Sequence, residues 1–543
     1  MKKQVKQLVV VVLSIVFAVS QIAAEQAVKG KQRRMKAAAP TCAPTGLVTC
    51  PPLPTMPPPV MSASIPFALP PHDTPTPEQA RPFFDYYSWQ EFIALNWPAA
   101  IESGTGLPVR GVPNTSSGVN MGSPGTRVWE TWKADYELFR PIDPSTKQPG
   151  VPSPWPSYAL SSSANPTCPA SPCGPKGAKL LVMQSKMDSV LNGVNQAFTG
   201  PLIAQNNTYV RYEIRTNQSE YEYVANAPTP NPFNLPMYIR ANLPTNANTP
   251  IDFSSTTPAN GGSYGAMEVK AAWRELKPGE DDSRYYWVNA ILVDNPGTSC
   301  RCAKMALVGL HIANKLSPFR EWVWSTFEQV DNVPQVNPDP PSCAQTKPSG
   351  AYSFNNGSAT NPDGYDYQPD PITPPIPNPA STPAVEVNRV QDITGCTKCI
   401  NNMFQQFLVQ QLGANTVWQY YQLVATQWPA SQNQFQVGAN YPYNCDCPFP
   451  ASPTTSTNDP VSNLTMETYL QEYTSCMQCH YMAAQTDFSF ILQEDAYPPS
   501  SSAAAALKSL KTTDPINKLR QFLRQNRAGH AQRMSAMKRA RKK

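Results

Sequence analysis

The sequence predicts an α+β protein in which a β-rich, antiparallel domain, residues 83–333, precedes a small helical domain, residues 396–495. Two patterns predict this division. In the first range, short runs alternate apolar and polar residues between Asn- and Pro-rich turns, as half-buried strands do. In the second range, apolar residues recur at helical spacing. The chain also has 61 prolines in 543 residues, about twice the usual share, which predicts long Pro-rich loops.

The N-terminus has the pattern of an export signal. Three lysines precede an apolar run over residues 8–19, and Ile22-Ala23-Ala24 follows as a cleavage site. We therefore expect a signal peptide at residues 1–24 and a bacterial protein that is periplasmic or secreted. The apolar run is short for a membrane span. Residues 25–82 are rich in proline and are expected to form an extended leader.

The β-rich domain opens with an aromatic run, Phe84–Leu95, whose apolar residues are spaced as in a helix that stops before Pro98. Strands are then expected where apolar residues alternate with polar ones or form short continuous runs. In chain order these segments are Val210–Arg215, Met267–Arg274, Tyr285–Val288, Ala290–Val293, Met305–Ile312 and Trp322–Phe327. Turn-rich stretches between them favour an antiparallel arrangement such as a sandwich.

Residues 334–395 are rich in Pro, Asn, Ser and Gly and are expected to form a linker or a long surface insertion. In the helical domain, the apolar residues of 403–412 predict a helix that Gly413 ends. Residues 417–424 predict a second helix, and residues 465–474 a short third one.

Residues 496–543 form a basic tail. Twelve Lys or Arg and one acid lie between residues 508 and 543, a net charge of +11. Such a tail could bind an anionic surface, or it could only keep the chain soluble. We expect no nucleic-acid partner for an exported protein.

The most specific motif is Cys476-Met-Gln-Cys479-His480. This C-x-x-C-H spacing is the attachment signature of a c-type haem. The two thiols bond to the vinyl groups of the porphyrin, and His480 supplies an axial nitrogen to the iron. The alternative is a disulfide between Cys476 and Cys479 that precedes a solvent-facing histidine. The export signal favours one covalent haem c, because this haem is attached outside the bacterial inner membrane.

Around this motif, the chain resembles exported bacterial proteins of the cytochrome c family with a single haem motif near the C-terminus. The resemblance covers most of residues 83–495. It implies a cytochrome-c-like fold for the helical domain and one bound haem, but no particular reaction. The stretches that carry it, besides the motif, are Trp89–Pro98, Val128–Lys133, Glu268–Arg274, Gly309–Ile312, Trp322–Glu328, Met466–Tyr469 and Asp487–Phe490.

The second axial ligand of the iron has two kinds of candidate in the sequence. Only Met482, Met534 and Met537 follow the motif, and none lies on a loop typical of a methionine ligand. His311 is a candidate distal ligand, because it shares a strand face with Leu307 and Gly309. We expect it to be buried, and Gly309 would leave space for a flat ring. The alternative is a core histidine that bonds to a backbone carbonyl.

A second cysteine pair, Cys396 and Cys399, is followed by Ile400 instead of histidine. It predicts a disulfide rather than another haem, and a zinc site with Cys445 and Cys447 is a weaker alternative. Histidines are too few for a metal-binding cluster, and no nucleophile–His–Asp set or phosphate-binding loop is found.

Charged residues on two strands give the only candidates for acid–base chemistry. Glu268, Lys270 and Arg274 share a strand face, and Glu328 ends another strand. The simpler interpretation is a charged face in contact with solvent. Acid–base groups beside a haem are the alternative.

The sequence therefore leaves three hypotheses. The first is an exported monohaem c-type cytochrome that transfers one electron to a redox partner protein. The second is a haem-dependent oxidoreductase, peroxidase- or oxygenase-like, in which an open sixth iron position faces a small-molecule substrate held by the β-rich domain. The third is a binding protein whose haem is vestigial.

Overall fold

The computed structural model places the described residues in the second of the chain's two units, Val48–Lys543. Short gaps fall at 69, 71–76, 197–198, 296–298, 318 and 320–321. With these gaps, the described residues are 56–139, 152–158, 179–181, 195–225, 252–257, 264–335, 352–357, 363–372, 381–429, 461–471, 475–480, 483 and 487–491.

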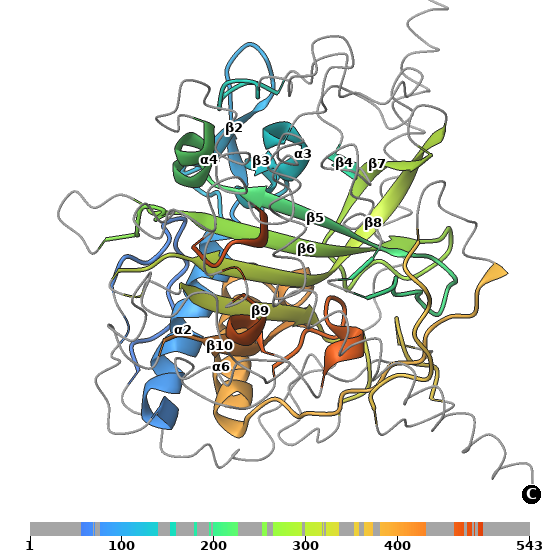
Figure 1. Ribbon diagram of the computed structural model, residues 1–543. Coiled ribbons are helices and arrows are strands. Elements are labelled where there is room, and N and C mark those ends of the chain that lie inside the picture. The colour runs from blue at the N-terminus through green and yellow to red at the C-terminus, as the bar shows by residue number, and fades with distance from the viewer. Residues whose placement is uncertain are drawn as a thin grey trace, which may run out of the picture. The chain divides into compact units, whose positions relative to one another are not determined.

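An eight-stranded sheet is the frame of the fold (Figure 1). Its central path runs β10-β9-β8-β6-β5-β3, and β7 adds to β8 and pairs with β4. Every pairing is antiparallel except that of β4 with β7. The strands are β3 (Lys133–Ala134), β4 (Lys179–Leu181), β5 (Val210–Thr216), β6 (Met267–Leu276), β7 (Trp287–Asn295), β8 (Ser299–Asn314), β9 (Val323–Gln329) and β10 (Tyr421–Gln427).

Helices and one hairpin surround the sheet in the described structure. The hairpin pairs β1 (Ala99–Ile101) with β2 (Pro108–Pro113). The helices are α2 (Pro77–Leu95), α3 (Asp135–Leu138), α4 (Gln218–Ala225), α6 (Gly395–Leu412) and α7 (Cys476–His480), with 3-10 turns η1 (Trp129–Thr131), η4 (Val417–Tyr420) and η5 (Thr468–Leu470). The predicted α+β class with a β-rich, antiparallel part is confirmed. No described helix combines the length and the apolar composition that crossing a bilayer requires.

Two long helices, α2 and α6, cover one face of the sheet, here called the helical face (Figure 1). The ring of Phe327 on β9 lies 5.2 Å from Trp89 and 4.4 Å from Phe92, both on α2. Trp89 in turn stacks on Phe404 of α6 at 5.3 Å. The apolar spacing that predicts these helices therefore marks the side that each buries.

The ends of α6 follow from local chemistry. Thr394 caps its first turn by accepting a hydrogen bond from the backbone N–H of Thr397. Gly413, with φ of 91°, ends it in a backbone conformation that other residues rarely adopt.

The opposite face of the sheet, here called the motif face, receives the C-terminal segment 461–491. Asn463 donates to the carbonyl of Phe327 at 2.8 Å, and the N–H of Leu464 donates to Glu328 at 2.6 Å. Tyr212 on β5 donates to the carbonyl of Thr465 at 2.7 Å. The segment is thus held across several strands by polar contacts.

The prediction of a helix over residues 417–424 is wrong. A 3-10 turn, η4, is followed by strand β10, which pairs with β9 through Tyr421↔Gln329 and Gln427↔Trp324. All seven residues of β10 are buried. A strand that is buried on both sides has no alternation, so its apolar spacing does not distinguish it from a helix.

The predicted helix over residues 465–474 is also wrong in extent. Only η5, Thr468–Leu470, is helical in the described part of this range. The side chain of Gln196 accepts from the N–H of Thr468 and donates to the carbonyl of Thr465. Contacts with a distant segment therefore take the place of helical hydrogen bonds.

Parts of the expected leader and linker pack into the structure. Ile65 joins the main core, and Tyr264 donates to its carbonyl at 3.1 Å. Helix α2 begins at Pro77, earlier than the aromatic run predicts. Phe354, Val385 and Val387, from the range expected to be a linker, are fully buried in a second cluster. The signal peptide and the basic tail lie outside the described residues.

Candidate functional site

The C-x-x-C-H motif forms α7, a helix of five residues on the motif face. The N–H of Met477 donates to the side-chain oxygen of Gln427 on β10 at 3.1 Å, and the Met477 side chain is buried in the main core. The N–H of Cys479 bonds to the carbonyl of Ser475 at 3.1 Å. One buried residue between the two cysteines therefore fixes the motif to the sheet.

His480 is held in one orientation by three neighbours. Its Nδ1 lies 2.7 Å from the carbonyl oxygen of Phe488. Its ring packs on Trp324 of β9, with centroids 3.8 Å apart, and meets the edge of Phe490 at 4.9 Å. A carbonyl only accepts hydrogen bonds, so Nδ1 carries the hydrogen and Nε2 carries the lone pair of the neutral ring.

The protonation state of His480 suits a metal ligand. Burial lowers the pKa of His480 to about 3, although the bond to Phe488 opposes the shift. The imidazole is therefore neutral at pH 7. A histidine that donates one ring N–H to a backbone carbonyl while the other nitrogen keeps its lone pair has the arrangement found in metal-ligating histidines.

Neither Cys476 nor Cys479 takes part in a disulfide. The alternative of a disulfide followed by a solvent-facing histidine is therefore not found, since His480 is also only partly exposed. Burial raises the pKa of Cys476 well above its ordinary value. Two thiols and a neutral imidazole, brought together in one turn of helix, are a donor set that fits a covalently attached haem.

A charged cluster formed by Lys270, His311 and Glu467 lies beside the motif. Lys270 on β6 and His311 on β8 are register partners, so their side chains share the motif face. Nε2 of His311 is 3.4 Å from a carboxylate oxygen of Glu467. Burial acts to raise the pKa of Glu467, but the opposing effects of His311 and Lys270 are larger together. The pKa of Glu467 is therefore lowered. His311 and Lys270 also act to lower the pKa of His480, so the structure brings the predicted residues Lys270, His311 and His480 together.

The surroundings of His311 differ from the prediction in three ways. A β-bulge near Val308 turns Leu307 toward the helical face, so Leu307 and His311 do not share a face. The space at Gly309 is filled, because a Cβ there would collide with Oγ1 of Thr465. His311 is also partly exposed, with 15% of its side chain accessible, and its contact is Glu467 rather than a backbone carbonyl.

The charged residues of β6 do not form a solvent face, contrary to the simpler interpretation. Glu268 and Arg274 are 8% and 5% exposed. Ser489 of the C-terminal segment donates a hydrogen bond to Glu268, whereas Arg274 forms an ion pair with Glu280 at 2.8 Å. Glu328 is 1% exposed and is bound by Arg389 and the N–H of Leu464. Ser489 is 221 residues from Glu268 and Leu464 is 136 residues from Glu328, so the strand sequences give no sign of these contacts and the alternation predicts solvent instead.

A buried acidic cluster, Glu220, Glu268 and Asp487 with Lys315, lies next to Phe488 and was not predicted. Lys315 forms ion pairs with Asp487 and, at 2.6 Å, with Asp252. Burial raises the pKa of Asp487 to about 7 against the effect of Lys315. Burial and the neighbouring Glu268 raise that of Glu220 well above its ordinary value.

The predicted disulfide between Cys396 and Cys399 is wrong. Cys396 is in no disulfide, whereas Cys399, like Cys302, is disulfide-bonded. Both cysteines lie in the first turn of α6, but Cys399 is buried and Cys396 is half-exposed, so they face different surroundings. A bonded Cys399 is no longer a zinc ligand. Among the described residues, no three His, Cys, Asp or Glu side chains are grouped to hold a metal ion.

Comparison with models of known protein families, with curated proteins and with solved structures finds no match. The remaining residues weighed as iron ligands, Met482, Met534 and Met537, lie outside the described residues. Sequence reasoning missed Glu467 and the carbonyl of Phe488, which are contacts that only the folded chain creates.

Proposed function

We propose that this chain is an exported protein that carries one covalent haem c and transfers single electrons. Cys476 and Cys479 would hold the porphyrin, and His480 would bind the iron through Nε2. The observation that carries the proposal is the hydrogen bond between Nδ1 of His480 and the carbonyl of Phe488, at 2.7 Å. It leaves the lone pair on the nitrogen that the motif assigns to the metal. Bound haem c would supply the one-electron iron couple.

The residues around the motif have supporting roles in this proposal. Trp324 and Phe490 keep the imidazole from rotating, since they pack on its face and its edge. Met477 and Gln427 anchor the helix that carries the thiols. A ligand held rigidly on both sides reorganises little when the charge at the metal changes, which suits electron transfer.

Residues 396–495 would be the haem-binding part of the chain, with a cytochrome-c-like attachment motif. Helix α6 and the motif helix belong to this range. Strand β10 belongs to it as well and pairs with β9. The haem-binding part would therefore be built onto the sheet, and the sheet would serve as its support and as the docking side for a redox partner.

Export of the chain is part of the proposal. Disulfide-bonded Cys302 and Cys399 support it, because disulfides persist in oxidising compartments such as the periplasm. A covalent haem c is attached in the same compartment, so the two expectations are consistent.

The rival function is a haem-dependent oxidoreductase with an open sixth iron position. The contact between His311 and Glu467 favours this rival, because a histidine that is paired with a carboxylate can act as an acid–base group. The same contact is compatible with ligation, since Glu467 faces Nε2 of His311 and the other ring nitrogen would then bind iron.

Covalent attachment tests the proposal. The full-length chain should be produced in a bacterium with the c-haem maturation system, and denaturing gels should be stained for haem. We expect a stained band at the mass of the mature protein, and its loss when Cys476→Ala and Cys479→Ala are combined. Cys396→Ala is the matched control, because this thiol is also outside any disulfide, and it should keep the stain. An unstained wild-type band would contradict the proposal.

A further inference from the structure

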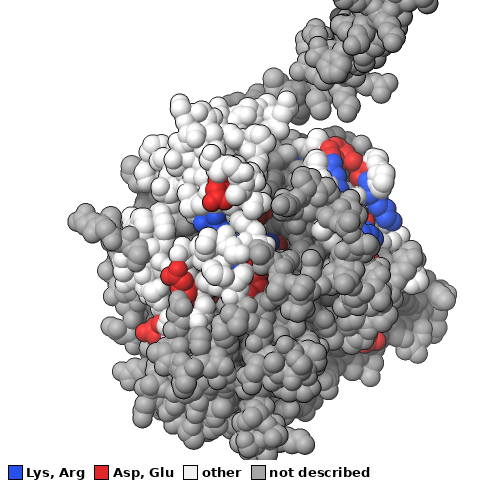
Figure 2. Space-filling view, turned by 90° about the horizontal axis from the view of Figure 1, so that it is seen from above, with Lys and Arg blue, Asp and Glu red and all other residues white. Residues whose placement is uncertain are grey.

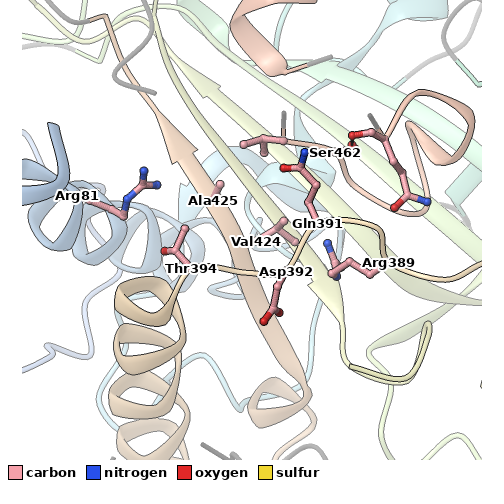
Figure 3. A pocket seen from close by; sticks show the side chains of 10 residues that line it. Arg81, Arg389, Gln391, Asp392, Thr394, Val424, Ala425 and Ser462 are labelled. Carbon is pink, nitrogen blue, oxygen red and sulfur yellow. Dashed lines mark hydrogen bonds between the residues drawn. The ribbon is translucent and has the colours of Figure 1, made fainter. Parts of the chain in front are cut away.

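A pocket of about 310 Å³ lies at the β10 edge of the sheet, between the first turns of α2 and α6 (Figure 3). Arg81 enters it from α2, and Arg389 and Gln391 lie on the other side. Val424 and Ala425 of β10 lie between them. Its volume is at the lower end of the range for small-molecule sites. It involves none of the residues proposed to hold the haem.

Arg81 is the unusual member of this lining. Its side chain is only 6% exposed, yet it forms no hydrogen bond or ion pair with any described residue. A guanidinium that is largely buried gives up part of its hydration, and hydrogen bonds to a bound anion would restore what it lost. Arg81 lines the cavity, so a ligand bound there could accept hydrogen bonds from its guanidinium.

The other charges at the pocket are already paired. Arg389 forms an ion pair with Glu328, and Lys398 lies 2.6 Å from Asp392. Asp85, one turn after Arg81, bonds to Oγ1 of Thr397 at 2.7 Å. Burial raises the pKa of Asp85 despite the nearby charge of Arg81, and so favours its neutral form. Arg81 thus lies near Asp85 but shares no hydrogen bond or ion pair with it or with any other described residue.

The N-terminus of α6 adds a second attraction for an anion. Thr394, the capping residue of this helix of 18 residues, lines the pocket. The first N–H groups of a helix and its dipole favour negative charge at this end. Gln391, an exposed side chain at the pocket, forms no hydrogen bond with another described residue and can donate from its amide.

We propose that this pocket binds a small organic oxyanion, with Arg81 as its anchor. The planar guanidinium matches a carboxylate in two parallel hydrogen bonds, and Val424 and Ala425 accommodate a short apolar body. A phosphate would present similar oxygens to the same donors. The carboxylate is the expected source, because its two oxygens match the paired donors of one planar guanidinium.

Calorimetric titration of the full-length protein tests this site, with succinate and inorganic phosphate as separate probes at constant ionic strength. We expect saturable binding of succinate with one site per chain. Arg81→Gln should weaken it about 10- to 100-fold, as expected for loss of a charged hydrogen-bonding partner. Lys277→Gln removes an exposed positive charge elsewhere on the surface and should leave the affinity unchanged.

Ala425→Leu gives an independent test that leaves Arg81 in place. The larger side chain would fill the pocket from β10 and should abolish binding, and it remains informative where Arg81→Gln fails to fold. Saturable binding of phosphate instead of succinate, with the same dependence on Arg81, would support the site with the other source. No binding of either probe by the wild type would overturn the proposal. So would affinities unchanged in Arg81→Gln or Ala425→Leu.

Discussion

His480 shows how far a single residue can be interpreted from sequence. The spacing of the motif names it as an axial ligand, but only the fold shows that Nδ1 bonds to Phe488 and that Trp324 packs on the ring. These contacts join segments that no sequence pattern predicts to be neighbours. The motif predicts the donor, and the fold adds what orients it.

His311 is the residue on which the two proposed functions differ. If it supplies the second axial ligand, ferric wild-type protein should be low spin and His311→Ala should turn high spin, because a strong ligand is lost. Glu467→Gln keeps an acceptor beside Nε2 of His311 and should remain low spin. Optical and electron paramagnetic resonance spectra measure the spin state. A high-spin wild type would contradict ligation and favour the oxidoreductase.

Glu91 gives a prediction about stability and pH. This carboxyl group is fully buried on α2 and accepts a hydrogen bond from Asn314 at 2.6 Å. Burial raises its pKa to about 8, above that of the unfolded chain. The folded state therefore binds more protons than the unfolded state between these values, and stability should fall as pH rises from about 5 to 8. One such group contributes a slope of up to about 1.4 kcal/mol per pH unit.

Glu91→Gln should flatten this dependence, because an amide resembles the neutral acid and does not titrate. Urea unfolding at several pH values between 5 and 8 measures the slope in wild type and variant. Glu222→Gln, at an exposed position on α4, is the control and should keep the wild-type slope. Equal slopes for Glu91→Gln and wild type would show that Glu91 is not the group responsible.

At the scale of elements, the covering segment 461–491 decides how the motif face is built. Its turn at Asn463–Met466 fits against the backbone of β8 only because residue 309 has no side chain. Gly309→Ala should therefore destabilise the protein by about 1–3 kcal/mol, as overpacking does. Denaturant unfolding measures this loss.

Gly395→Ala is the matched control for this prediction. A Cβ at Gly395, in the first turn of α6, meets no atom within 4 Å. The substitution should leave stability unchanged or raise it by about 0.4–1 kcal/mol. A Gly309→Ala variant as stable as wild type would mean that segment 461–491 does not pack closely on β8.

The elements differ in how well the sequence predicts them. Strands β5 and β6 have clear alternation, and α6 has both helical spacing and a terminal glycine. Strand β10 is buried on both sides, so its apolar and polar residues do not alternate. Its sequence therefore predicts a helix instead of a strand. Strands β3 and β4, of two and three residues, are too short to leave any pattern.

The sequence predicts those parts of the site whose residues are adjacent in the chain. The motif lies in five consecutive residues, whereas the Lys270–His311–Glu467 cluster joins β6, β8 and the C-terminal segment. The pocket at Arg81 likewise combines α2, α6 and β10. Such sites depend on strand register and on which segments cover the sheet. Composition and residue spacing predict neither.

At the scale of the whole molecule, the described surface offers no large patch of one charge on the face seen in Figure 2. Acidic and basic side chains there lie side by side among uncharged ones. Among the described residues, Arg301 forms ion pairs with both Glu275 and Asp294. A redox partner that docks on this face would be recognised by shape and apolar contact more than by net charge.

The central claim is a haem bonded covalently to Cys476 and Cys479, and the most direct measurement is the intact mass of the purified mature protein. We predict a mass that exceeds that of the polypeptide by one haem after full denaturation, and that falls to the bare polypeptide when both cysteines are replaced by alanine. A wild-type protein that was produced with the maturation system, and that has the mass of the polypeptide alone, would contradict the account.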